Sequence, residues 1–120
     1  MKNKIIASFF LTVLFAAVVF SCRVHAQEAP QRIEIVAQRF SYAPNEITLK
    51  KGVPVLLVLT SKDVDHGMKF KELGLDIKIK KHATTEVPFT PEKAGTFTGQ
   101  CSVFCGSGHG SMKITLHVTE

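Results

Sequence analysis

From residue 33 onward the sequence is a succession of short β-type runs separated by turn-forming residues. Residues 53–60 are nearly all apolar, which predicts a central strand buried on both faces. Pro54 cannot donate to a sheet ladder, so it is expected at the very start of that strand. No segment carries apolar residues at a sustained helical period. The pattern therefore predicts an all-β domain, built as a sandwich or a barrel.

The other runs alternate apolar and polar side chains, as strands with one buried face do. They are expected at residues 33–40, 47–49, 76–80, 84–89, 96–100 and 113–118. Residues 42–45 and 91–95 combine Pro with Asn or Gly and are predicted to be turns. The runs together predict one domain over residues 33–120, preceded by a polar leader at 27–32.

Residues 1–26 have the pattern of a targeting segment: basic residues, an apolar run at 5–20, and a small residue at the end, Ala26. As a helix the run would be about 24 Å long, shorter than a hydrocarbon core of about 30 Å. Three interpretations stay open: a signal cleaved after Ala26, a lipoprotein signal processed at Cys22, or an uncleaved anchor holding the protein to the membrane through residues 5–22. All three place the domain outside the cytoplasm, in the periplasm or at the outer face of the cytoplasmic membrane.

The net charge of the predicted domain is smaller than that of the whole chain. The formal net charge is +5, of which residues 1–26 contribute three basic residues and no acidic one. Residues 27–120 therefore hold 12 basic and 10 acidic residues, a net charge of +2. A domain of mixed sign lacks the concentrated basic face that nucleic-acid binding requires, so no nucleic-acid partner is expected.

The residues that carry chemistry are concentrated between the last two predicted strands. Cys101, Cys105, His109 and Met112 lie within twelve residues, with glycines between them. Thiolate and thioether sulfur select copper(I), and imidazole accepts copper in either oxidation state. Two cysteines four residues apart can bring both sulfurs to one small site, and the glycines permit the tight backbone path. The segment therefore predicts a copper site.

A further ligand is expected upstream of this segment. His66 follows the buried strand, in a predicted loop at 63–67, and loops at one end of a sandwich converge. His82 and His117 are predicted to be solvent-exposed. Met68 is expected in the core, with an auxiliary soft ligand as the alternative.

Two other chemistries use the same residues. An oxidising compartment would also allow a disulfide between Cys101 and Cys105, which would make the chain a structural secreted domain. That bond would close a short loop and restrict little chain entropy, and it leaves the histidines and Met112 without a role. Zinc accepts cysteine and histidine, but methionine is a poor ligand for it.

The spacing Cys-x3-Cys-x3-His-x2-Met with an upstream histidine resembles the copper A (CuA) domain of cytochrome c oxidase subunit II and of nitrous-oxide reductase. The resemblance extends over residues 33–120 and includes the stretches 40–45 and 61–67. It implies a cupredoxin-like fold, a Greek-key β-sandwich or barrel. A mononuclear blue-copper protein needs one cysteine in this loop, so the second thiol argues against that relative.

The resemblance implies two copper ions in a dinuclear CuA centre with ligands at six positions: His66, Cys101, Val103, Cys105, His109 and Met112. Both thiolates would bridge the two ions, and each imidazole would terminate one of them. The thioether would be a weak ligand of the ion bound by His66, and the backbone carbonyl of Val103 the matching weak ligand of the other. The family usually has Glu or Gln at position 103, but a carbonyl ligand does not require a particular side chain.

The resemblance implies one-electron transfer outside the cytoplasm, with no substrate turned over by the domain itself. The implied partners are a redox protein that donates the electron, either cytochrome c or a small copper protein, and subunit I of a haem-copper oxidase. A stand-alone carrier and an oxidase subunit would share the same residues. A copper chaperone or sensor is the hypothesis from another class, and would hold copper(I) through His66, Met68 and the cysteine pair.

Overall fold

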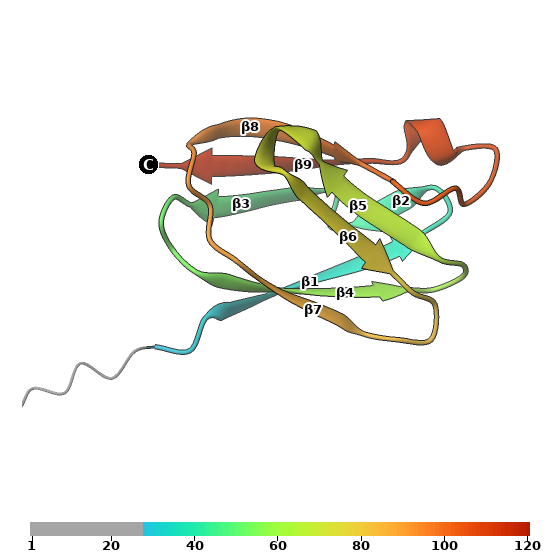
Figure 1. Cartoon of the computed structure of the whole chain (residues 1–120), viewed down its shortest axis with the longest axis horizontal. Helices are drawn as coiled ribbons and strands as arrows, with labels where there is room; N and C mark the ends of the chain where they lie inside the picture. The colour runs from blue at the N-terminus through green and yellow to red at the C-terminus, as the bar shows by residue number, and fades with distance from the viewer. Residues whose placement is uncertain (1–27) are drawn as a thin grey trace, which may run out of the picture.

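The computed structural model describes residues 28–120, which form a sandwich of nine strands and two single-turn 3-10 helices (Figure 1). The strands are β1 (Gln31–Gln38), β2 (Ser41–Ala43), β3 (Glu46–Lys50), β4 (Val55–Ser61), β5 (His66–Phe70), β6 (Leu75–Ile79), β7 (Thr85–Phe89), β8 (Gly95–Gln100) and β9 (Lys113–Thr119). The 3-10 helices are η2 (Lys71–Leu73) and η3 (His109–Ser111). The predicted all-β class is confirmed. The predicted signal or anchor at 1–26 lies outside the described residues, and β1 begins inside the predicted leader.

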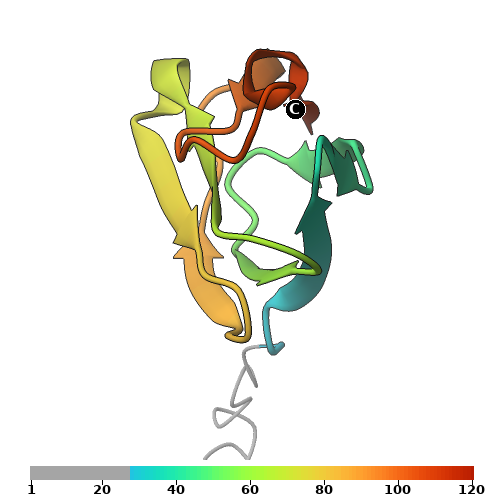
Figure 2. The ribbon, with the colours of Figure 1, turned by 90° about the vertical axis from the view of Figure 1, so that its right-hand side faces the viewer.

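The strands form two sheets that enclose one core (Figures 1 and 2). One sheet has the order β2-β1-β4-β7 and the other the order β3-β9-β8-β5-β6. β1 pairs with β4 in parallel, as β3 does with β9, so the chain crosses repeatedly between the sheets. The apolar run predicted as a central strand is β4, which lies between β1 and β7 directly after Pro54.

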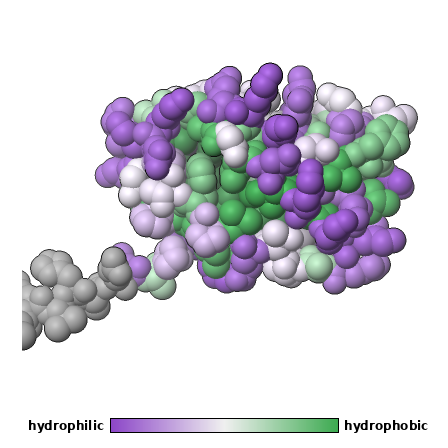
Figure 3. Space-filling view, in the orientation of Figure 1, coloured by the Kyte–Doolittle hydropathy of each residue, from purple (hydrophilic) through white to green (hydrophobic). Residues whose placement is uncertain are grey.

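Alternation along the strands determines which side chains face the core. Ile35 of β1, Leu59 of β4 and Ile79 of β6 are fully buried, with no exposed area. On β6 the lysine at position 78 faces outward between two buried isoleucines, as the sequence predicted. Polar side chains cover much of the face seen in Figure 3, with apolar side chains visible between them. Within the described residues no helix is long and apolar enough to cross a membrane.

Two local predictions differ from the structure. Residues 42–45 were predicted to be a turn, but the first two of them belong to strand β2, which pairs with β1. The predicted loop at 63–67 ends early, because His66 is already the first residue of β5. The apolar or aromatic residues of β5 are His66, Met68 and Phe70, and Gly67 lies between the first two. A Cβ at Gly67 would overlap the hydroxyl of Ser102 and lie 3.1 Å from the backbone nitrogen of Val103, so the close approach of two segments favours glycine there.

Candidate metal centre

The structure brings all six predicted ligands together at one end of the sandwich, which faces the viewer in Figure 2. We call this end, defined by its four connections, the site end; the connections are residues 39–40, 62–65, 80–84 and 101–112. The sulfur of Cys101 lies 3.9 Å from Nδ1 of His66 and 3.1 Å from the carbonyl oxygen of Val103. The sulfur of Cys105 lies 3.8 Å from Nδ1 of His109 and 3.9 Å from Sδ of Met112.

The two cysteine sulfurs are 3.8 Å apart, and both thiols are free. A disulfide bond is about 2.05 Å long. The Cys101–Cys105 disulfide, which the sequence allowed as an alternative, is therefore not formed in the structure. A thiolate binds a metal such as zinc at about 2.3 Å, so two sulfurs at this separation can both contact the same ion. Sulfur, imidazole and thioether donors are the soft and intermediate set that suits copper. The residues present therefore fit a copper site.

His66 is held in one orientation by Asp63. The imidazole is fully buried, and its Nε2 donates to Oδ1 of Asp63 at 2.7 Å, which leaves Nδ1 as the lone-pair nitrogen beside Cys101. The backbone amides of Arg39 and Val64 also donate to this carboxylate, each at 2.7 Å. Partial burial opposes ionisation, but these hydrogen bonds and that from His66 lower the pKa of Asp63 to about 2. A charged carboxylate therefore fixes the tautomer of the ligand.

Two residues of the β1–β2 connection contact the connection that carries the cysteines and hold it in place. Nε of Arg39 donates to the carbonyl oxygen of Cys105 at 2.8 Å. The ring of Phe40 packs against Gly106 and Gly108, and a Cβ at Gly108 would lie 2.5 Å from Cγ of that ring. Gly106 also has a φ of +139°, which L side chains rarely adopt. The path between the cysteines and His109 is thus determined by contacts that only glycine allows.

Burial is uneven around the site. The cysteines are 4% exposed and Met112 is fully buried, whereas His109 is half-buried. Burial raises the pKa of Cys105 to about 11, so the metal-free thiol is neutral and metal binding must displace its proton. Phe104 is 79% exposed, and its ring centroid lies 5.7 Å from that of His109. Solvent therefore reaches the site beside His109.

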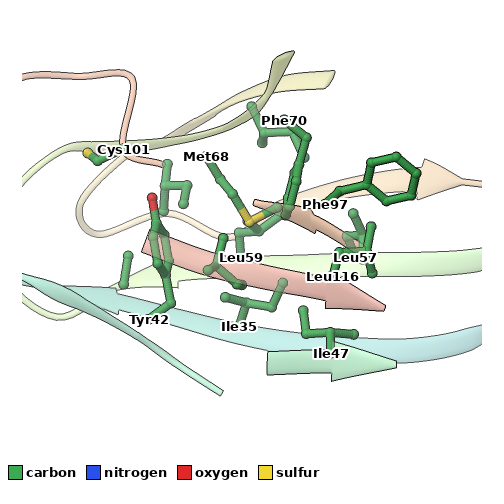
Figure 4. Close-up of a cluster of buried hydrophobic side chains, with 14 of the residues drawn as sticks. Ile35, Tyr42, Ile47, Leu57, Leu59, Met68, Phe70, Phe97, Cys101 and Leu116 are labelled. Atoms are coloured by element: carbon green, nitrogen blue, oxygen red, sulfur yellow. The ribbon is translucent and has the colours of Figure 1, made fainter. Parts of the chain in front are cut away.

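Tyr42 lies between Cys101 and the core, with its hydroxyl on the side of Cys101 (Figure 4). Its hydroxyl donates to the carbonyl oxygen of Gly67 at 2.5 Å, and burial raises its pKa, so the phenol stays neutral. Met68 is buried, and Figure 4 shows its sulfur directed into the core away from Cys101, as expected of a core residue. His82 is exposed, and His117 lies on β9 with Nδ1 3.2 Å from Oγ1 of Thr96, far along the strand from the cysteines.

Sequence reasoning did not assign roles to Arg39, Phe40 or Asp63. An acidic residue three positions before a predicted histidine ligand, in a turn, was an available signal for Asp63. Arg39 and Phe40 gave no such signal, because the side-chain contacts by which they hold the ligand connection join residues more than sixty positions apart.

A two-sheet sandwich with cysteine, histidine and methionine gathered on the loops at one end defines the cupredoxin class of copper-binding domains. The chain belongs to the cupredoxin-like domain family, whose model matches residues 10–114. It is 28% identical over 88 residues to cytochrome c oxidase subunit 2 of Thermus thermophilus, an alignment covering 73% of this chain and 65% of that relative. The chain thus spans just under two thirds of the length of that relative, and the predicted resemblance to subunit II is confirmed.

Solved structures show the same fold at lower sequence identity. The periplasmic domain of subunit II of the cytochrome oxidase of Bradyrhizobium japonicum superposes with a TM-score of 0.69 at 22% identity, over 80% of this chain and 88% of that domain. A chain from a haem-copper terminal oxidase dimer superposes with a TM-score of 0.66 at 21% identity, over 98% of this chain and 97% of its own length. At these identities the likeness supports the fold, and the chemistry is argued from the ligand residues.

Proposed function

We propose that this protein transfers single electrons outside the cytoplasm through a dinuclear copper centre. The observation that carries the proposal is the convergence of six donor groups, two of which are cysteine sulfurs 3.8 Å apart. The family places the chain among copper-binding folds, and the similarity to an oxidase subunit II favours electron transfer over other uses of copper. The ligands would be those six groups: His66, Cys101, the Val103 carbonyl, Cys105, His109 and Met112.

When bound, the copper pair would supply a one-electron couple with its charge spread over both metals and both sulfurs. The chain contributes negative charge and rigidity. The thiolates of Cys101 and Cys105 offset the positive charge of the metal, which is needed because the site is almost fully buried. Asp63 holds His66, and Arg39 holds the carbonyl of Cys105, so the donor groups keep their positions in both oxidation states.

The proposed partners are a redox protein that donates the electron and subunit I of a haem-copper oxidase that accepts it. The relatives support this assignment, because one is cytochrome c oxidase subunit 2 and another was solved in a haem-copper terminal oxidase. A periplasmic location is supported by the Bradyrhizobium japonicum relative, which is a periplasmic domain. A stand-alone carrier would use the same site, and co-purification with haem-containing subunits would distinguish the two. A chaperone that uses Met68 as a ligand gains no support, since that sulfur faces the core.

The proposal is tested by the copper content and the electron paramagnetic resonance spectrum of the copper-loaded protein. We expect two copper ions per chain and a hyperfine pattern produced by one electron shared between two copper nuclei. The matched control is Ser102→Ala, which leaves every proposed donor in place. One copper per chain with the pattern of a single nucleus would contradict the proposal.

A further inference from the structure

The net charge of the described residues is concentrated at the site end. Its four connections hold four basic residues, Arg39, Lys62, Lys80 and Lys81, against two acidic ones, Asp63 and Asp65. The remaining residues of the range 28–120 hold eight basic and eight acidic side chains, so their charges cancel. The net charge of +2 therefore belongs to the end of the molecule that carries the copper ligands.

Both acidic residues at this end are already used inside the protein. Asp63 accepts hydrogen bonds from His66 and from two backbone amides. Asp65 accepts from Nζ of Lys80 at 3.0 Å and from the backbone amide of Lys81 at 2.9 Å. Neither carboxylate is left to attract a cationic partner.

Three basic side chains at the site end remain uncompensated. Lys62, Lys81 and Arg39 are exposed, and none of them forms an ion pair with a carboxylate of the part of the chain that the structure describes. Arg39 donates to a backbone carbonyl, which satisfies a hydrogen bond but does not neutralise its charge. The two lysines therefore act outward, toward whatever docks at this end, and Arg39 beside the ligand connection adds to the positive charge there.

Phe104 supplies an apolar contact beside these charges. It is one of two large hydrophobic side chains exposed among the described residues, and it lies against the half-buried His109. The connection that carries it, residues 101–112, contains no Asp, Glu, Lys or Arg. An apolar centre next to a charged rim is the usual composition of a transient protein interface.

We propose that the redox partner docks on the site end through an acidic surface, with an apolar contact to Phe104. The inference rests on the proposed function, because docking here brings the partner's redox group close to His109. One electron leaves the partner, which is oxidised, and enters the site, which is reduced. A partner with a basic docking face would be repelled by Lys62, Lys81 and Arg39, so the charge of the face selects between partners.

The test uses two forms of one probe that differ in charge: reduced basic cytochrome c, and the same protein with its lysines succinylated to carboxylates. Each is titrated into the metal-free, 15N-labelled protein at low ionic strength, and amide chemical shifts are recorded. We expect the succinylated form to shift amides around Lys62, Lys81 and Phe104, with affinity about tenfold higher than that of the native form. The difference should shrink when salt is raised to about 0.1 M, where the screening length is about 10 Å.

Two double variants with the same change of charge, one at each end of the sandwich, show which end is responsible for the preference for the succinylated probe. Lys62→Glu with Lys81→Glu should abolish the preference for the succinylated probe. Lys71→Glu with Lys93→Glu, at the opposite end of the sandwich, should preserve it. Phe104→Ser should weaken binding of the succinylated probe without changing its salt dependence.

The proposal is overturned if the native probe binds at least as tightly as the succinylated one, if neither probe shifts amides at the site end, or if the two double variants behave alike. Because these shifts do not need copper, they report docking even where the dinuclear centre fails to assemble. Failure of the docking proposal is therefore distinguishable from failure of the proposed function.

Discussion

Gly108 and Gly110 lie two residues apart in the connection that carries the copper ligands, but their surroundings differ. A Cβ at Gly108 would lie 2.5 Å from Cγ and 2.9 Å from Cε2 of the Phe40 ring, whereas a Cβ at Gly110 would have no neighbour within 4 Å. Gly108 has a φ of −91°, which alanine also adopts, so the backbone itself does not forbid the substitution. The pair therefore separates contact with Phe40 from any general effect of adding a methyl group.

The expected cost of Gly108→Ala follows from this overlap. Carbon atoms in favourable contact lie about 3.5–4.0 Å apart, so the ring or the connection must move by about 1 Å. Overpacking of this kind costs about 1–3 kcal/mol. If the metal-free connection relaxes and the copper-bound one cannot, the cost appears as copper affinity weakened about 5- to 150-fold.

The assay is copper retention against a competing chelator, measured for wild type, Gly108→Ala and Gly110→Ala. We expect Gly110→Ala to match wild type, and Gly108→Ala to lose copper at lower chelator concentration. Phe40→Ala added to Gly108→Ala should recover part of the loss, because it removes the overlapping ring. Equal affinities in the two alanine variants would refute the idea that Phe40 holds the ligand connection in place.

The remaining predictions concern the ligands, the core and pH. Cys105→Ser should leave at most one copper per chain and abolish the shared-electron spectrum, which elemental analysis and paramagnetic resonance measure. Leu59→Ala, at a fully buried position, should lower the free energy of unfolding by about 2–5 kcal/mol in urea titrations, and a smaller loss would show that the core relaxes. Asp63 has its pKa lowered from 3.8 to about 2, so the stability it provides should be full above pH 4 and lost as the pH falls toward 2. The difference in unfolding free energy between metal-free wild type and Asp63→Asn should therefore decline over that range, and a constant difference would count against this role.

Most of the ligands could be predicted because they lie close together in the sequence, at a spacing typical of a metal site. Cys101 and Cys105 lie four positions apart in one connection, so the spacing alone allows their sulfurs to meet there. His66 was predictable for a different reason, because the end of a buried strand determines which end of the sandwich it reaches. The apolar run of β4 likewise predicted a strand at the centre of its sheet, and β4 lies between β1 and β7, with Leu56 half-buried on its outer face.

The groups that support the ligands could not be predicted in the same way. Arg39 and Phe40 act on residues more than sixty positions later, and nothing in their own neighbourhood indicates that contact. The first two residues of β5 were assigned to a loop because they follow the buried strand, whereas in the fold they already pair in a sheet and Gly67 packs against Ser102. Local propensity did not predict the roles of these residues, because their roles depend on contacts with residues distant in the sequence.

X-ray absorption at the copper edge reports whether the two cysteine sulfurs jointly hold two copper ions. If both ions bind about 2.3 Å from each sulfur and in one plane with the two sulfurs, which are 3.8 Å apart, they would lie about 2.6 Å from each other. We expect a copper–copper contribution at that short distance in the loaded protein, and its loss in Cys101→Ser. A spectrum with copper–sulfur contacts but no neighbouring copper in the wild-type protein would contradict it.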